Sequence, residues 1–197
     1  MSFVVGLTGP TGAGKSSVTQ VAQDLGFKVI DCDRFARIAV EKGSAGLLDI
    51  VKAFGDSVIN SDGTLNRKAL AQAAFSTAEK TKLLNQTLLP HIVNLITNEI
   101  NEPRVLLDAP TLFESGADSL CDAIIVVLSD EKARKKRIMQ RDGIDESAAE
   151  LRIKAGKSDE FYIEKTNNIV YNDCELSVLN LKIQKLLNKL LEEYNNV

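Results

Sequence analysis

The stretch GPTGAGKS, from Gly9 to Ser16, fits the pattern G-x-x-x-x-G-K-[ST] at every position. An apolar run from Phe3 to Leu7 precedes it, and a helix-like stretch from Ser17 to Leu25 follows it. A strand, a glycine-rich loop and a helix in this order form a phosphate-binding loop, because glycines let backbone N–H groups approach a phosphate chain that side chains would keep away. The sequence therefore predicts a nucleoside triphosphate site.

The residues of this loop have distinct expected tasks. Lys15 is expected to reach the β- and γ-phosphates, and the hydroxyl of Ser16 is expected to ligate Mg²⁺. The helix that begins here adds the positive end of its dipole to the same place. The residues expected to contact the nucleotide are Gly9, Thr11, Gly12, Ala13, Gly14, Lys15 and Ser16.

The composition is that of an ordinary globular protein, with 44% hydrophobic and 26% charged residues in 197. The net charge of −3 argues against nucleic-acid binding, which usually requires a basic excess. The N-terminus lacks a basic signal region, and no apolar stretch approaches the length of a membrane span. Cys32, Cys121 and Cys174 have neither metal-ligand spacing nor a disulfide pattern. We expect a cytoplasmic protein without nucleic-acid or membrane partners, as a monomer or small homo-oligomer.

Strand and helix patterns alternate along the chain, which predicts an α/β fold with a mainly parallel sheet and helices on both faces. After the first strand, the expected strands lie at 27–30, 104–107, 123–128 and 168–171. Apolar residues at helical spacing from Leu176 to Leu190 predict a C-terminal helix that packs on the sheet.

Between 34 and 102 no segment has a convincing strand pattern, and roughly seventy residues are far more than a crossover between parallel strands needs. We interpret 34–102 as a helical insertion over the carboxyl edge of the sheet, where such folds bind ligands. The charged segment 134–165 is expected to form a helical lid. The chain is then one domain, 1–197, with its core at 1–33, 103–133 and 166–197.

Two carboxylates, Asp31 and Asp33, follow the second expected strand. Alternate residues of an extended segment point in opposite directions, so one of them is expected to face the reacting groups. A carboxylate there could accept a proton from an attacking hydroxyl. The alternative is that Asp33 caps a helix beginning at Arg34. His91, the only histidine, is expected to be a surface or capping residue rather than a base.

Asp108 ends an apolar strand in the manner of a Walker-B carboxylate, which holds Mg²⁺ through water. An ordinary strand-end turn is the alternative. In the charged segment, Arg134, Arg137 and Arg141 fall at helical spacing on one face. Guanidinium groups suit a transferring phosphoryl group, so these arginines are candidates for a lid that excludes water; the alternative is a solvated basic helix.

Several segments in fixed order carry a family resemblance. They are VVGLTGPTGAGKSSV around the phosphate loop, VIDCDRFAR at 29–37, DGTLNR at 62–67, DAPTLFE at 108–114 and RIMQRD at 137–142. Together they resemble the dephospho-coenzyme A kinase family of P-loop kinases over nearly the whole chain. The chain departs from the family's usual pattern at Leu89, Thr111, Gly156 and Asn168.

The resemblance implies a P-loop NTPase-type sheet flanked by helices and an ATP-dependent phosphorylation of the ribose 3′-hydroxyl of dephospho-coenzyme A, the last step of coenzyme A synthesis. It implies ATP as co-substrate with Mg²⁺, Asp33 as the base, and Arg67 with the helical insertion as the acceptor site. Lys15 would hold the triphosphate, on which Arg141 and Arg137 would close. The alternatives are another nucleoside or nucleotide kinase of the superfamily, or a nucleotide-dependent switch, although the N-K-x-D segment of guanine-specific switches is missing.

Overall fold

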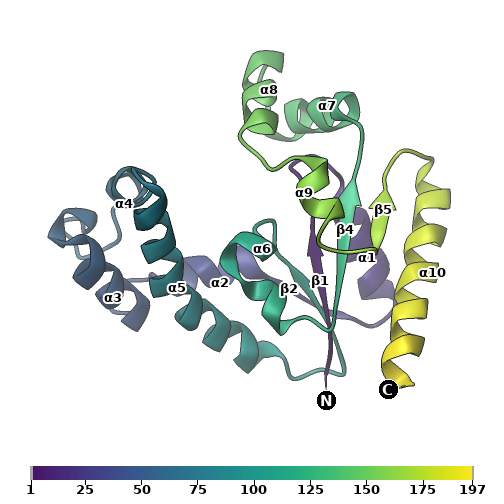
Figure 1. Ribbon diagram of the computed structural model, residues 1–197, viewed down its shortest axis with the longest axis horizontal. Helices are drawn as coiled ribbons and strands as arrows, with labels where there is room; N and C mark the ends of the chain where they lie inside the picture. Colours follow the sequence, from purple (N-terminus) through teal and green to yellow (C-terminus); the bar gives the residue numbers. More distant parts are fainter. Residues whose placement is uncertain (1, 197) are drawn as a thin grey trace. The chain divides into compact units, whose positions relative to one another are not determined.

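A computed structural model describes residues 2–196 of the chain (Figure 1). These residues divide into two compact units. The first lies within Met1–Ile30, Glu102–Leu112 and Asp118–Val197, and the second comprises Asp31–Asn101 and Phe113–Ala117. Within the described residues, no helix is both long enough and apolar enough to cross a membrane.

A five-stranded sheet with the order β2-β3-β1-β4-β5 forms the centre of the first unit. Its strands are β1 (Phe3–Thr8), β2 (Lys28–Asp31), β3 (Arg104–Asp108), β4 (Ala123–Leu128) and β5 (Ile169–Tyr171). β1 pairs in parallel with both β3 and β4, and β4 pairs in parallel with β5. All six residues of β1 are buried, which accounts for its uninterrupted apolar run at the middle of the sheet. The expected parallel α/β sheet is confirmed.

Two helices of the first unit pack against each other and against the sheet. They are α1 (Lys15–Asp24) and α10 (Leu176–Asn195), and Figure 1 shows α10 running beside β5 and α1. The stripe of α10 that joins the core consists of Leu179, Ile183, Leu187 and Leu190. The expected packing of this helix is therefore confirmed, although Leu176, at its first turn, is 62% exposed.

The charged segment forms three helices of the first unit: α7 (Glu131–Asp142), α8 (Glu146–Lys154) and α9 (Asp159–Ile163). An aspartate or serine caps each of them, because Asp130, Asp145 and Ser158 accept hydrogen bonds from first-turn N–H groups. Ile138 of α7 packs with two residues of α8, Ala149 and Ile153. The short helices α6 (Leu112–Ser115) and η2 (Ala117–Leu120) connect β3 to β4.

The second unit is helical, as predicted for 34–102. It contains α2 (Cys32–Ile38), α3 (Ala45–Phe54), η1 (Asp56–Val58), α4 (Arg67–Ala74) and α5 (Ala78–Glu99). A single antiparallel bridge joins Ile59 and Leu65. The unit has a small core of its own, formed by Val40, Ile50, Val58, Leu70 and Ala74. α5 packs against α2, α3 and α4 and so holds the unit together.

Candidate active site

The phosphate loop connects β1 to α1, and three of its glycines have positive φ angles: 141° at Gly9, 78° at Gly12 and 98° at Gly14. Little space is left around them. A Cβ atom on Gly9 would overlap the carbonyl oxygen of Val127, and one on Gly14 would overlap Nδ2 of Asn172. Both backbone conformation and packing therefore require glycine at these positions of the motif.

The first turn of α1 carries the two polar side chains that the motif predicts. Lys15 is the first residue of the helix, and its Nζ donates a hydrogen bond to the carbonyl oxygen of Gly9 at 2.9 Å. Ser16 is exposed. Gly14, the N-cap residue, has no side chain to cap the first turn, so an anion can take that place at the positive end of the helix.

Asp108 lies next to this loop, because it ends β3 and pairs in register with Leu7 of the adjacent β1. Thr19 Oγ1 lies 3.3 Å from Oδ2 of Asp108 and 3.3 Å from the carbonyl oxygen of Lys15. The side chain of Thr19 thus connects α1 to the strand-end carboxylate.

Ser16 and Asp108 supply hard oxygen donors, which are the ligands that Mg²⁺ prefers. Within residues 2–196, no group of three or more His, Cys, Asp or Glu side chains is arranged to hold a metal ion. A site with one carboxylate and one hydroxyl suits Mg²⁺, which keeps several waters and takes further ligands from substrate phosphates. The residues present therefore fit this ion.

The arginines of α7 have different surroundings. Nε of Arg134 donates to the carbonyl oxygen of Thr11 at 3.1 Å, and its side chain is only 7% exposed. Nη1 of Arg137 lies 3.1 Å from the carbonyl oxygen of Gly12 and 3.3 Å from that of Ala13. Two of the predicted lid arginines therefore contact the phosphate loop itself, and Arg134 is buried rather than part of an open basic face.

Arg141, the third of these arginines, is 61% exposed in its side chain and forms an ion pair with Asp142, in which Nε and Oδ1 are 2.8 Å apart. Hydrogen bonding from Arg141 lowers the pKa of Asp142 below its ordinary value, and the charge of Arg152, which also contacts this carboxylate, adds to the effect. In this structure Arg141 is thus a surface residue held by a neighbouring carboxylate.

In the second unit, the two candidate carboxylates differ in their contacts. Asp31 is the N-cap of α2, and its Oδ1 accepts hydrogen bonds from the N–H groups of Asp33 at 3.0 Å and Arg34 at 3.3 Å. The helix begins at Cys32, so the interpretation that Asp33 caps a helix beginning at Arg34 is wrong. The reason is that the chain turns directly at the end of β2, which places Asp31 at the cap. Asp33 lies exposed in the first turn.

The DGTLNR segment forms a tight turn ahead of α4. The carboxylate of Asp62 accepts hydrogen bonds from both the N–H and the hydroxyl of Thr64, and Gly63 has a φ of 81°. Asn66 then caps α4 through the N–H of Ala69. Most of this segment thus forms the turn and the cap of α4. Arg67 follows as an exposed residue at the start of that helix.

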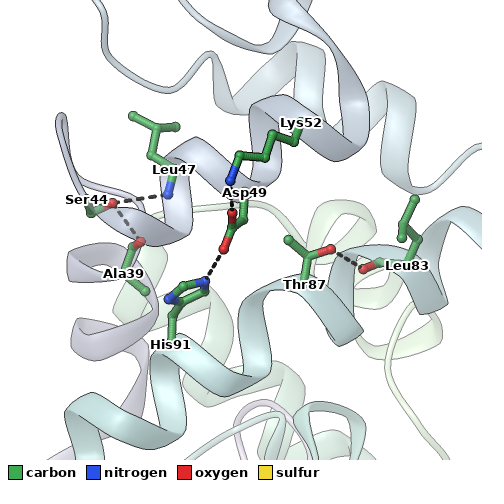
Figure 2. A network of polar contacts seen from close by, with 8 residues as sticks. All are labelled: Ala39, Ser44, Leu47, Asp49, Lys52, Leu83, Thr87 and His91. Atoms are coloured by element: carbon green, nitrogen blue, oxygen red, sulfur yellow. Dashed lines mark hydrogen bonds and ion pairs between the residues drawn. The ribbon is translucent and has the colours of Figure 1, made fainter.

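His91 connects two helices of the second unit, as Figure 2 shows. Its Nε2 lies 2.9 Å from Oδ2 of Asp49, whose other oxygen accepts a hydrogen bond from Lys52 at 2.8 Å. These hydrogen bonds, from Lys52 first and His91 second, lower the pKa of Asp49. His91 therefore joins α5 to α3 through a partly buried contact, whereas the sequence predicted a surface or capping residue.

Sequence patterns did not point to three polar residues around the loop: Thr19, Ser129 and Asn172. Nδ2 of Asn172 donates to the carbonyl oxygen of Ala13 at 2.8 Å, and Oγ of Ser129 donates to the carbonyl oxygen of Asn172 at 3.0 Å. Ser129 follows β4 and Asn172 follows β5. Their place just beyond the carboxyl ends of two parallel strands was the available signal, because ligand sites of such sheets lie there.

Similarity to known proteins identifies the family to which a chain with this phosphate loop belongs. The chain matches the family described as dephospho-CoA kinase over residues 3–177. The chain belongs to the dephospho-coenzyme A kinase family. A dephospho-coenzyme A kinase from Fusobacterium nucleatum subsp. nucleatum is 36% identical over 187 residues, which are 93% of this chain and 96% of that protein. One from Listeria innocua is 35% identical over 202 residues, covering 100% of this chain and 99% of the relative.

Solved structures resemble the chain over its whole length. Dephospho-coenzyme A kinase from Campylobacter jejuni has a TM-score of 0.65 at 25% identity, with 98% of this chain and 100% of that chain covered. A protein from Thermus thermophilus has a TM-score of 0.76 at 27% identity, covering 98% and 97%. Shikimate kinase from Bacteroides thetaiotaomicron, at 16% identity with a TM-score of 0.53 over 96% and 98%, shares the fold. Membership of a kinase family implies ATP as the co-substrate.

Proposed function

We propose that the protein transfers the γ-phosphoryl group of ATP to the ribose 3′-hydroxyl of dephospho-coenzyme A, which gives coenzyme A in the final step of its synthesis. The observation that carries this proposal is an intact phosphate loop, from Gly9 to Ser16, in a chain that belongs to the dephospho-coenzyme A kinase family over most of its length. A kinase for a different nucleoside or nucleotide, or a nucleotide-dependent switch, would also carry such a loop but would not explain the family match.

On the donor side, the loop from Gly9 to Gly14 would surround the phosphates with backbone N–H groups, and Lys15 would leave Gly9 to contact the β- and γ-phosphates. Arg137 belongs to this site because it contacts the loop carbonyls. Arg141 would leave its ion pair with Asp142 and contact the transferring phosphoryl group, whose negative charge a guanidinium stabilises.

Ser16 and Asp108 would hold magnesium at the same loop, with Asp108 acting through water. Bound there, Mg²⁺ would supply positive charge that offsets the negative charge of the phosphates during the transfer. Thr19 supports the proposed role of Asp108 through its contact with Oδ2.

On the acceptor side, Asp33 would accept the proton of the 3′-hydroxyl. The hydroxyl oxygen forms a bond to the γ-phosphorus, the bond from that phosphorus to the β,γ-bridging oxygen breaks, and ADP leaves with the electron pair. Asp31 is the weaker candidate for the base, because its carboxylate already accepts two backbone hydrogen bonds at the cap of α2.

Two further residues of the second unit support acceptor binding there. Arg67 is an exposed cation at the start of α4, and the acceptor carries a diphosphate that a guanidinium would contact. Glu114 has its Oε2 buried without a hydrogen-bond partner within the described residues. A buried polar atom of this kind requires an explanation, and a hydroxyl or amino donor of a bound acceptor would supply one.

We also propose a cytoplasmic enzyme that acts on small molecules without nucleic-acid or membrane partners, as a monomer or small homo-oligomer. The net charge of −3 and the scattered cysteines support this assignment. Light scattering of the purified protein at several concentrations would measure the oligomeric state.

The decisive experiment measures ADP release with ATP and Mg²⁺ in the presence of dephospho-coenzyme A, adenosine, AMP or other nucleosides and monophosphates. We expect brisk turnover only with dephospho-coenzyme A, and phosphorus NMR of the product should show a new 3′-phosphomonoester. Lys15→Ala is the inactive control, because it removes the phosphate-binding ammonium and should weaken nucleotide binding and turnover together.

Two outcomes would contradict the proposal. Turnover of a nucleoside or monophosphate without turnover of dephospho-coenzyme A would make the protein a different nucleotide kinase. Slow ATP hydrolysis without any acceptor, together with nucleotide-dependent capture of a protein partner, would indicate a switch.

A further inference from the structure

We propose that Asn172 is a positioning residue of the phosphate loop, whose side-chain amide orients the Ala13–Gly14 peptide so that the N–H of Gly14 points toward the bound phosphates. This inference rests on the proposed nucleotide site but not on the identity of the acceptor. Asn172 follows β5 and lies 159 positions from Ala13 in the sequence.

The contact between Asn172 and the loop is direct. Nδ2 of Asn172 donates a hydrogen bond of 2.8 Å to the carbonyl oxygen of Ala13, and both groups are buried. Only 9% of Asn172 is exposed. A buried carbonyl needs a donor, and here side chains rather than the backbone donate to it: Asn172 at 2.8 Å and, at a longer distance of 3.3 Å, Nη1 of Arg137.

The peptide unit between Ala13 and Gly14 couples the direction of the carbonyl that Asn172 binds to the direction of the N–H on the other side of the loop. A trans peptide is planar, so its C=O and N–H groups point in opposite directions. Fixing the carbonyl of Ala13 on Asn172 therefore turns the N–H of Gly14 to the opposite side of the loop. Arg134 does the same for the N–H of Gly12, because it binds the carbonyl of Thr11 at 3.1 Å.

Asn172 is itself held in place. Its N–H donates to the carbonyl oxygen of Leu128 at 2.8 Å. Its carbonyl oxygen accepts a hydrogen bond from Oγ of Ser129 at 3.0 Å and lies 3.4 Å from Nη2 of Arg137. A side chain that orients a binding loop must have little freedom of its own, and these contacts provide that restriction.

Asn172 and Gly14 also fit each other closely. A Cβ atom at Gly14 would overlap Nδ2 of Asn172, so the amide occupies the space that a side chain at Gly14 would need. The chemistry at position 172 also requires an amide. An aspartate would have nearly the same shape, but it would place a carboxylate oxygen against the carbonyl of Ala13 and would lack the donor.

The test compares Asn172→Asp with Asn168→Asp, which makes the same chemical change beside the other end of β5, away from the loop. Calorimetry would measure the Kd of ADP with Mg²⁺, and steady-state kinetics would measure the KM of ATP and of dephospho-coenzyme A. Asn172→Asp should raise the Kd of ADP and the KM of ATP by roughly 10-fold, as expected when a buried acceptor loses the shorter of its two hydrogen bonds, and should leave the KM of dephospho-coenzyme A unchanged. Asn168→Asp should leave all three unchanged.

Asn172→Ala provides a second variant, because it removes the donor without adding a charge, and it should change the two nucleotide constants in the same direction. An unchanged Kd of ADP in either folded variant would overturn the proposal. So would failure of both variants to fold without nucleotide, or an equal rise in both KM values, because Asn172 would then serve the fold in general. Wild-type protein that binds ADP but does not phosphorylate dephospho-coenzyme A would contradict the proposed function alone.

Discussion

The phosphate loop and the DCD segment, Asp31 to Asp33, each follow a strand and open a helix, but their surroundings differ. The loop has its carbonyl oxygens bound by side chains from two distant places: Arg134 and Arg137 of α7, and Asn172 after β5. In the DCD segment, Asp31 makes a local contact, in which its carboxylate accepts the N–H groups two and three residues further on.

This difference has a physical consequence. The loop must present several N–H groups to one anion, so its peptide planes need support from outside the segment. The DCD segment has to offer a single carboxylate, and the cap at Asp31 starts the helix whose first turn carries Asp33. We therefore expect substitutions around the loop to affect nucleotide binding over long sequence distances, and substitutions around Asp33 to act locally.

The largest expected effect is that of Asp33→Asn. It should lower kcat by roughly 10²- to 10⁴-fold with nearly unchanged ATP affinity, because a positioned base contributes about that much. Asp31→Asn is the matched control and should retain most of the activity, since asparagine is as good an N-cap as aspartate. Steady-state kinetics and ADP calorimetry would measure both. Exchanged roles, with Asp31→Asn inactive and Asp33→Asn active, would show that Asp31 is the base.

Next in size is the comparison of two glycines with positive φ angles, 98° at Gly14 in the loop and 81° at Gly63 in the turn before α4. Gly14→Ala should weaken ATP binding by at least roughly 10- to 100-fold, because backbone strain of about 1–3 kcal/mol is added to the overlap with Asn172. A Cβ on Gly63 would meet only Lys42, whose Cε lies 3.2 Å away and can move. Gly63→Ala should therefore leave ATP binding unchanged, and equal losses in the two variants would contradict the distinction between the regions.

A smaller effect is expected from Asp31→Ala, which removes the cap of α2. The free energy of unfolding should fall by about 0.5–2 kcal/mol, the usual loss for an N-cap residue, as measured by urea denaturation. Asp31→Asn should restore most of this stability. If Asp31→Ala were as stable as the wild type, the hydrogen bonds of the cap would not stabilise α2, the helix that carries Asp33.

The smallest effect concerns acid stability and the Asp49 contacts with Lys52 and His91 (Figure 2). The pKa of Asp49 lies below its ordinary value of 3.8 in the folded protein, so the unfolded chain binds this proton more readily. The resulting stability is complete above about pH 3.8 and is lost as the pH falls through the lowered pKa. Asp49→Asn should therefore make the stability less dependent on pH in this acid range, and Lys52→Gln should do so in part. Identical acid unfolding curves for Asp49→Asn and the wild type would contradict this account.

The sequence patterns were most informative where neighbours in the chain determine the structure. Uninterrupted apolar runs predicted the buried strands β1 and β4, and helical spacing from Leu176 to Leu190 predicted the stripe of α10, of which the part from Leu179 onward packs on the core. The alternative that Asp33 caps the helix was wrong, because aspartate is an equally suitable cap residue at 31 and 33, and only the direction of the chain after β2 distinguishes the two. The roles of Lys15, Ser16, Arg67, Asp108 and Arg141 toward ligands stay predictions.

By itself, the sequence determined that this chain carries a phosphate loop between a strand and a helix, and it placed the chain among kinases that phosphorylate dephospho-coenzyme A. The motif is contiguous, and the φ angles it requires are available to glycine alone. Only the tertiary structure decided which side chains hold the loop: Asn172 across 159 positions and Arg134 across 123. No periodicity encodes such contacts, because they arise when parallel strands bring their carboxyl ends to one edge of the sheet.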